Sequence, residues 1–112
     1  MDTNHAIVTQ DKHILVITLN RPEKRNALSP GMLMRVYDAW QELKSNEDLR
    51  CAVITGNGGT FCSGADLSAM KEGNEDAEMM EKLKEIPDLH WQALLRHNRP
   101  NKPIIAAVEG FA

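Results

Sequence analysis

The residues best suited to chemistry form a glycine-rich stretch at residues 56–67, with the sequence Gly-Asn-Gly-Gly-Thr-Phe-Cys-Ser-Gly-Ala-Asp-Leu. Four glycines fall within nine residues, which lets the backbone turn sharply and leave N–H groups exposed. Exposed N–H groups between a strand and a helix carry partial positive charge and suit an anion or a developing oxyanion. We therefore interpret the stretch as a candidate oxyanion loop, although a plain strand-to-helix turn has the same glycine content.

Two nucleotide-binding motifs fit this stretch poorly. A dinucleotide fingerprint beginning at Gly56 requires glycine where Phe61 stands. A phosphate-binding P-loop requires lysine and then serine or threonine where Ala65 and Asp66 stand. Ser63 also lies outside any Gly-x-Ser-x-Gly elbow, which argues against a serine hydrolase. The stretch therefore offers backbone groups rather than side chains to a ligand.

The composition indicates one ordinary globular domain. The chain has 112 residues, of which 42% are hydrophobic and 26% charged, and its net charge is −3. This charge predicts neither a nucleic-acid surface nor a basic membrane anchor. The first residues lack the pattern of a signal peptide, and no apolar run approaches the length of a membrane span. We therefore expect a cytoplasmic protein.

Cysteine and histidine usage predicts neither a disulfide framework nor a metal site. The two cysteines, Cys51 and Cys62, are too few for a disulfide scaffold, and we expect reduced structural thiols. His90 and His97 would lie two helical turns apart, whereas metal-binding pairs on a helix need a one-turn spacing. No nearby cysteine or carboxylate completes a ligand set.

Three apolar segments in the first half of the chain predict strands, at residues 5–9, 12–20 and 51–55. The first two are separated by Gln10-Asp11, which we expect to form the tight turn of a hairpin. In the second segment both alternating sets of side chains are largely apolar, as in a strand covered on both faces.

A helix is predicted between the second and third strands, because Ser29 can cap its first turn and Pro30 suits its first position. The strand–helix–strand order is typical of parallel strands. The polar loop at residues 21–26 follows the carboxyl end of a strand, where ligands of α/β proteins tend to bind. The expected apolar face of the helix comprises Leu33, Val36, Tyr37, Trp40 and Leu43.

The second half of the chain predicts two more helices and a strand. Residues 72–85 are charge-rich and predict a solvated helix or lid, which Pro87 then breaks. Residues 104–108 are apolar on both faces, as in the middle of a covered parallel sheet. Residues 89–97 predict another helix. Its inward-facing side chains are expected to be Trp91, Leu94 and Leu95.

Together with its flanking motifs, the glycine-rich stretch resembles a known family. Residues 61–67, Phe-Cys-Ser-Gly-Ala-Asp-Leu, look like the acyl-CoA signature of the crotonase superfamily, the enoyl-CoA hydratase/isomerase group. Residues 19–28 resemble the family's first CoA-contacting loop, and residues 52–56 the strand before its oxyanion loop. Residues 102–110 resemble the strand before its second oxyanion donor. The motifs occur in the family's order and span nearly the whole chain, so their joint occurrence is highly specific.

The resemblance implies an α/β fold, a crotonase-like ββα spiral, of which residues 1–112 would be the N-terminal half, an acyl-CoA-binding domain cut inside the fold. It implies a hydratase-like lyase, or an isomerase, that acts on an acyl-CoA thioester in fatty-acid or related metabolism. CoA would belong to the substrate, and no separate cofactor is implied. The expected protein is a cytoplasmic homo-oligomer, a trimer or hexamer, without nucleic-acid or membrane partners.

The resemblance also implies roles for individual residues. The N–H of Ala65 would form half of an oxyanion hole that stabilises the enolate of the thioester. Arg25 would lie near the phosphates of CoA. The residues carried over to substrate and CoA binding are Lys24, Arg25, Ala27, Gly64, Ala65, Asp66 and Leu67.

Two departures from the family pattern bear on activity. Ser63 stands where the family often has alanine, a small change. After a segment like Gly110-Phe111-Ala112 the family continues with a glycine run that carries the second oxyanion donor, followed by the catalytic glutamates. We therefore expect the 112-residue chain alone to be inactive, and assign no acid or base role to Asp66 or Glu109. The alternatives are a non-catalytic fragment that binds acyl-CoA or another subunit, and a generic nucleotide-binding domain.

Overall fold

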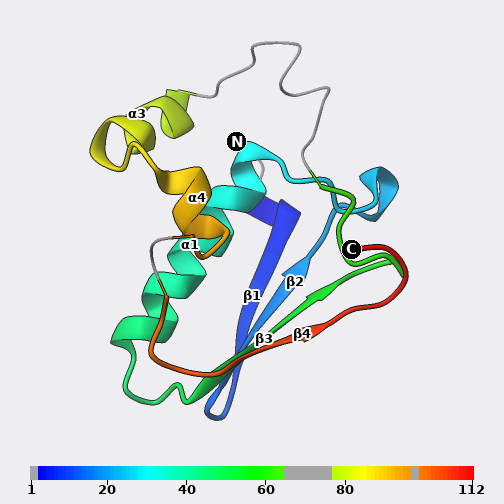
Figure 1. Ribbon diagram of the computed structural model, residues 1–112, viewed down its shortest axis with the longest axis horizontal. Coiled ribbons are helices and arrows are strands. Elements are labelled where there is room, and N and C mark those ends of the chain that lie inside the picture. Colours follow the sequence, from blue (N-terminus) through cyan, green and yellow to red (C-terminus); the bar gives the residue numbers. More distant parts are fainter. Residues whose placement is uncertain (1–2, 65–76, 97–98) are drawn as a thin grey trace.

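The computed structural model describes residues 3–64, 77–96 and 99–112. Its centre is a four-stranded sheet in the order β1-β2-β3-β4, with helices on one face (Figure 1). A short 3-10 turn, η1 (Thr3–His5), precedes the first strand. The strands are β1 (Ala6–Asp11), β2 (Ile14–Leu19), β3 (Cys51–Gly56) and β4 (Ile104–Ala107).

The hairpin formed by β1 and β2 is antiparallel, as predicted, but its turn lies two residues later than expected. Asp11 pairs with Ile14, so the two residues that turn the chain are Lys12 and His13. Lys12 adopts a positive φ of 56°, which supplies the left-handed conformation of a tight hairpin. The prediction that Gln10-Asp11 forms the turn was therefore wrong, because both residues still pair within the ladder.

Helix α1 (Pro30–Ser45) begins and packs as its sequence predicts. The Ser29 hydroxyl accepts a hydrogen bond from the N–H of Met32 at 3.1 Å, and Pro30 occupies the first turn. Four of the five predicted inward residues are buried, whereas Tyr37 is half-buried. The buried members of the predicted set are Leu33, Val36, Trp40 and Leu43.

The core lies between α1 and the sheet. Helix α1 contacts β1 and β2, and it connects β2 to β3, which run parallel. Ile17 and Leu43 are fully buried at the centre of this contact. The strand–helix–strand unit is thus confirmed, and it brings the carboxyl ends of β2 and β3 to the same edge of the sheet.

Helices α3 (Ala77–Glu85) and α4 (Leu89–Ala93) flank Pro87, as predicted. The expected inward face of α4 was wrong for two side chains: Trp91 and Leu94 are each 50% exposed, while Leu89 and Ala93 are buried. The helix is short, and Trp40 anchors its end by donating from Nε1 to the carbonyl of Ala93 at 2.8 Å.

Residues 94–96 after α4 do not continue the helix that the sequence predicted. The Arg96 guanidinium lies over the Trp91 ring, 4.9 Å from its centroid. Helix α4 ends at Ala93 and Leu95 has a φ of 63°, so Leu94 and Leu95 lie beyond the helix that the prediction extended to residue 97. Leu95 itself packs against the core, as expected. The predicted helix at residues 72–85 lies partly outside the described residues.

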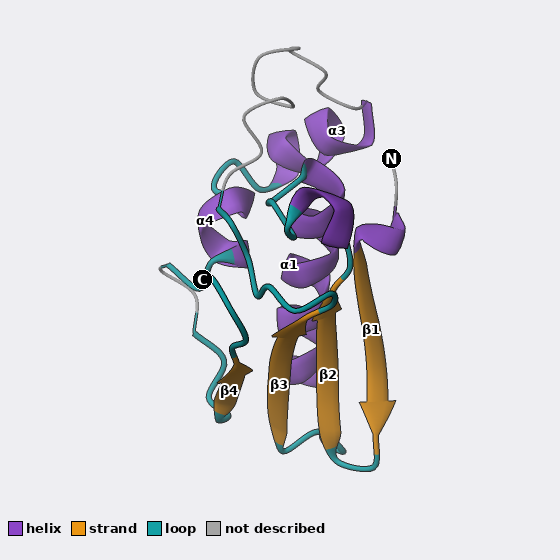
Figure 2. Cartoon of the chain, turned by 90° about the vertical axis from the view of Figure 1, so that its right-hand side faces the viewer, coloured by secondary structure: helices purple, strands orange, loops and turns teal. Residues whose placement is uncertain are grey.

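Strand β4 pairs parallel to β3 but forms the edge of the sheet in the described part of the chain. Ile105 is 55% exposed, and Val108 and Phe111 beyond the strand are also exposed. Figure 2 looks onto the sheet face opposite α1, which no described helix covers. The expectation that β2 and β4 are covered on both faces is therefore not met within residues 3–64, 77–96 and 99–112.

Candidate functional site

The glycine-rich loop leaves the carboxyl end of β3 through a turn that only small residues permit. A Cβ added to Gly56 would lie 2.5 Å from the carbonyl oxygens of Thr60 and Phe61, so the chain folds back against this residue. Gly58 and Gly59 follow with φ values of 84° and 85°, a conformation that favours glycine. The turn is therefore compact, and its shape depends on these glycines.

A second loop approaches this turn from the carboxyl end of β2. It contains the 3-10 turn η2 (Pro22–Lys24) and then two consecutive residues with positive φ, Arg25 at 52° and Asn26 at 57°. Asn26 is fully buried, and its side-chain amide donates to the carbonyls of Asn57 and Thr60 at 3.0 and 2.7 Å. The side chain of Asn26 thus ties this loop to the glycine turn.

Backbone hydrogen bonds join the two loops directly. The N–H of Ser63 donates to the carbonyl of Arg25 at 3.0 Å, and the N–H of Leu28 donates to the carbonyl of Gly64 at 2.7 Å. Both segments that the sequence assigns to CoA binding therefore meet in a short hydrogen-bonded pairing. We call residues 25–28 and 63–64 the paired segments.

The N–H groups of the loop are less exposed than the sequence suggested. Phe61 donates to the carbonyls of Glu109 and Phe111, Cys62 to the carbonyl of Phe111, and Ser63 to Arg25. The N–H of Gly64 points to the sulfur of Cys62 at 3.4 Å. The expectation that the loop leaves N–H groups free is therefore wrong for residues 61–64.

Residues Ala65, Asp66 and Leu67 lie outside the described residues, so their assigned roles stay predictions. Gly64 immediately precedes them, with a φ of 104° and no atom of the described residues within 4 Å of an added Cβ. Glycine at this position is therefore required by backbone conformation rather than by crowding. Within the described residues, the space next to Gly64 is open at the end of the paired segments.

The segment after β4 also contacts the loop, as Figure 1 shows near the C-terminus. In addition to the bonds from Phe61 and Cys62, Gly110 packs so closely that an added Cβ would lie 2.5 Å from the carbonyl oxygen of Gly59. The loop is thus held on one side by residues 21–28 and on the other by residues 109–111.

Three basic residues lie in the β2 loop, and they differ in accessibility. Lys24 and Arg25 are exposed. Arg21 is only 8% exposed, and its Nη1 donates to the carbonyl of Ala27 at 3.0 Å. Ala27 is itself buried, and its N–H donates to the carbonyl of Lys24. Of the predicted CoA contacts, Lys24 and Arg25 therefore offer charge to a ligand, whereas Ala27 is engaged within the loop.

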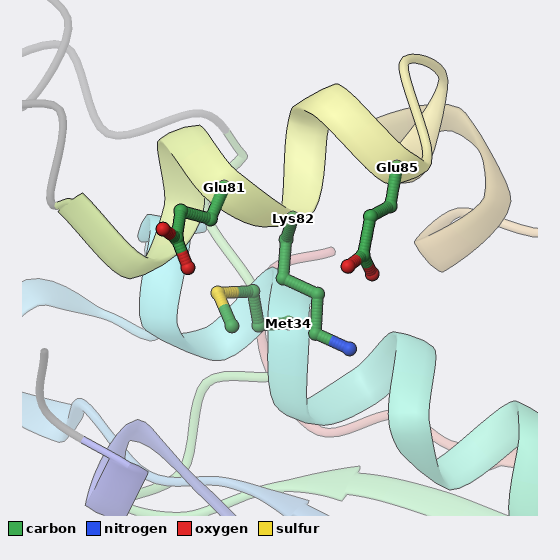
Figure 3. Close-up of a pocket in the computed structure, with 4 residues that line it drawn as sticks. All are labelled: Met34, Glu81, Lys82 and Glu85. Carbon is green, nitrogen blue, oxygen red and sulfur yellow. The ribbon is translucent and has the colours of Figure 1, made fainter.

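A separate groove of about 310 Å³ lies between α1 and α3. Figure 3 shows Glu81, Lys82 and Glu85 projecting from α3 beside Met34 of α1. Two carboxylates and one ammonium give these side chains a net negative charge, which disfavours phosphate groups. None of these four residues belongs to the paired segments.

The sequence did not predict the hydrogen bonds by which Arg21 stabilises its own loop and Asn26 joins the two loops of the site. Both belong to the family-like motif at residues 19–28, but neither was assigned a role of its own. No local signal pointed to the role of Asn26, because its acceptors lie at Asn57 and Thr60, far along the chain. Within the described ranges, no group of three His, Cys, Asp or Glu side chains is placed to hold a metal ion.

The fold places this chain in a defined class. A mixed α/β sheet with one helical face, and with two loops joined at the carboxyl ends of parallel strands, matches structures of the crotonase fold. Residues 9–112 match the family model described as enoyl-CoA hydratase/isomerase. The chain therefore belongs to the enoyl-CoA hydratase/isomerase family, as its motifs predicted.

Comparison with known proteins shows which share of their length the chain covers. It is 40% identical over 107 residues to the enoyl-CoA hydratase EchA19 of Mycobacterium tuberculosis, a match that covers 96% of this chain and 40% of that protein. It is 36% identical to the 2,3-dehydroadipyl-CoA hydratase of Escherichia coli, with coverage of 97% and 40%. The chain thus spans about 40% of the length of these relatives, in their N-terminal portion.

The structural similarity has the same extent. A probable enoyl-CoA hydratase/isomerase from Mycobacterium abscessus matches with a TM-score of 0.77 at 38% identity, over 97% of this chain and 39% of that one. No helix in the described part of this chain has the length and apolar character needed to cross a lipid bilayer.

Proposed function

We propose that this chain forms the acyl-CoA-binding part of a hydratase- or isomerase-like enzyme that stabilises the enolate of a CoA thioester. The observation that carries the proposal is the hydrogen-bonded pairing of Arg25 with Ser63 and of Leu28 with Gly64. It brings together two sequence segments that resemble CoA-contacting motifs. The relatives named as hydratases of CoA thioesters support the same substrate class.

The proposed chemistry centres on the carbonyl oxygen of the thioester. The N–H of Ala65 donates one hydrogen bond to this oxygen, and a second donor comes from sequence beyond Ala112. Negative charge gathers on the oxygen when a base removes a proton from a neighbouring carbon, or when water adds to the double bond conjugated with the thioester, and the charge is lost when the enolate is protonated at carbon. A preorganised donor of this kind is worth roughly 3–4 kcal/mol in the transition state. The acid and base glutamates likewise lie beyond Ala112, so the chain alone binds without turning over.

Recognition of CoA divides between charge and backbone. Lys24 and Arg25 are exposed and carry the positive charge that attracts the CoA phosphates. Backbone groups of residues 64–67 contact the adenine and the pantetheine arm. CoA remains part of the substrate, and the full enzyme is a cytoplasmic homo-oligomer, a trimer or hexamer, in fatty-acid or related acyl-CoA metabolism.

A second candidate function is a non-catalytic part that binds acyl-CoA or another subunit. The exposed apolar side chains of Ile105, Val108 and Phe111 favour a protein contact at β4. This second candidate uses the same CoA site as the enzyme but catalyses no reaction. Hydration of an enoyl-CoA by the complete subunit therefore distinguishes the two candidates.

The experiment measures binding of crotonyl-CoA to the 112-residue chain by calorimetry, and hydration of crotonyl-CoA by both this chain and the complete subunit that contains it. We expect binding by the chain and turnover only by the complete subunit. ATP and NAD serve as comparison ligands, because tight binding of either without competition by CoA would indicate a nucleotide-binding domain. Turnover by the chain alone at the rate of the complete subunit would contradict the assignment of essential groups beyond Ala112.

A further inference from the structure

Asn26 has no reactive group and little access to a ligand, yet its side chain joins three backbone positions across the site. It is fully buried, and its Oδ1 accepts from the N–H of Arg21 at 2.7 Å. Its Nδ2 donates both of its hydrogens, to the carbonyls of Asn57 and Thr60. Both ends of the amide are thus hydrogen-bonded to backbone groups.

These bonds oppose a local conformational cost. Arg25 and Asn26 both adopt positive φ, which is unfavourable for residues with a side chain, although asparagine tolerates it better than most. The peptide group between Arg25 and Asn26 contains the Arg25 carbonyl, which accepts a hydrogen bond from the Ser63 N–H. The side-chain amide of Asn26 therefore stabilises the backbone conformation in which the Arg25 carbonyl faces Ser63.

The two acceptors lie on either side of the glycine turn. Asn57 precedes Gly58 and Gly59, and Thr60 follows them, so the Asn26 amide spans the turn as a clamp. Glycines have the greatest freedom to move, and a turn built from them is ordered only by outside contacts. Both bonds are partly buried, and replacing the amide would leave the two carbonyls without their shared donor, which few other side chains can supply.

We propose that Asn26 is the positioning residue of the acyl-CoA site, since it fixes the glycine turn against the β2 loop and thereby maintains the pairing of residues 25–28 with 63–64. The consequence for CoA rests on the proposed function of this site. The clamp itself does not, because it concerns hydrogen bonds within the chain.

The test compares Asn26→Asp with the parent chain by amide hydrogen exchange, recorded as protection factors. Aspartate keeps the shape and the acceptor but presents oxygen to the carbonyls of Asn57 and Thr60. We expect protection of the Ser63 and Leu28 amides to fall at least about tenfold, while that of Trp40 in α1 is unchanged. Asn57→Asp is the matched control, because it makes the same change on an exposed side chain, whose amide donates to Oδ1 of Asn20.

Protonation offers a rescue that a general loss of stability would not produce. Burial beside two carbonyls raises the pKa of the carboxyl introduced by Asn26→Asp, and the neutral form of this carboxyl regains one donor. Protection of Ser63 in Asn26→Asp is therefore expected to rise as the pH is lowered from about 8 to about 5, with no such rise in Asn57→Asp. If Asn26→Asp fails to fold, the neutral variant Asn26→Ser gives the same comparison with one donor retained.

Each outcome decides a separate claim. Unchanged protection at Ser63 and Leu28 in the folded variants, or an equal fall at Trp40, would overturn the positioning role. A local fall together with crotonyl-CoA binding weakened at least about tenfold supports both the clamp and its place in the site. A local fall in a chain whose parent form does not bind crotonyl-CoA supports the clamp and contradicts the proposed function.

Discussion

The N–H of Ser63 donates to the carbonyl of Arg25 at 3.0 Å, which joins two loops that leave neighbouring parallel strands. Arg25, whose side chain is exposed, is therefore hydrogen-bonded through its backbone to the residue that directly precedes residues 64–67. Under the proposed function, the CoA phosphates attracted by Arg25 would therefore lie near the paired segments. This relationship underlies the predictions that follow.

Arg25→Gln should weaken crotonyl-CoA binding by about tenfold while leaving the unfolding free energy nearly unchanged, because the side chain is exposed and its charge faces solvent. The effect should shrink as salt is added, since exposed charges are screened. Calorimetric titrations at two ionic strengths check both points. Arg50→Gln removes an exposed charge at the opposite end of β3 and should leave affinity unaltered; an equal loss in both variants would argue for a non-specific charge effect.

Gly64→Ala should lose acyl-CoA affinity and about 1–3 kcal/mol of stability, because a φ of 104° is unfavourable for alanine. Gly59→Ala is the comparison variant, since Gly59 also has positive φ. Both variants should show a comparable fall in urea denaturation midpoint. Gly64→Ala should weaken binding more than Gly59→Ala does, because Gly64 itself belongs to the paired segments, and equal affinities in the two variants would contradict a ligand site beside Gly64.

Gly56→Ala tests the close approach at the start of the loop. Its methyl group would meet the carbonyl oxygens of Thr60 and Phe61, which belong to backbone and cannot rotate away. We expect a loss of about 1–3 kcal/mol in the free energy of unfolding, measured in urea. A variant as stable as the parent would show that the turn can open without cost.

Ser29→Ala tests the start of the helix that carries the core. The hydroxyl accepts from the N–H of Met32 and also bonds to Nδ1 of His5 at 2.6 Å. Its removal should cost about 1 kcal/mol. Ser45→Ala removes an exposed hydroxyl that donates to the Gln41 carbonyl, and should change stability by less than about 0.5 kcal/mol. Thermal unfolding of the Ser29→Ala and Ser45→Ala variants checks this difference. Equal shifts of the melting temperature would contradict a stabilising helix cap at Ser29.

Local signals in the sequence predicted the elements that depend on local causes. Ser29 and Pro30 marked the start of α1, and the strand–helix–strand order predicted the parallel pairing of β2 with β3. The motifs also identified the family before the fold was known. These features succeed because capping, helical spacing and motif order are all contained in short stretches of chain.

The errors arose where distant residues decide the structure. Trp91 was expected inside, but α4 is anchored through the bond from Trp40 to Ala93, which the period of a short segment does not reveal. The glycine loop was expected to expose backbone N–H groups, but the carbonyls of Glu109 and Phe111 accept from the N–H of Phe61. Asn26 was read only as part of a motif, because its acceptors at Asn57 and Thr60 become neighbours only after folding.

The most direct test of the central claim is a titration of the labelled chain with crotonyl-CoA, followed by backbone amide shifts in NMR. The account predicts saturable shifts concentrated in residues 24–28 and 63–67, with little change at the amides of Glu81, Lys82 and Glu85 beside the groove on α3. Saturable shifts centred on α3, with residues 24–28 and 63–67 unaffected, would contradict an acyl-CoA site at the paired segments.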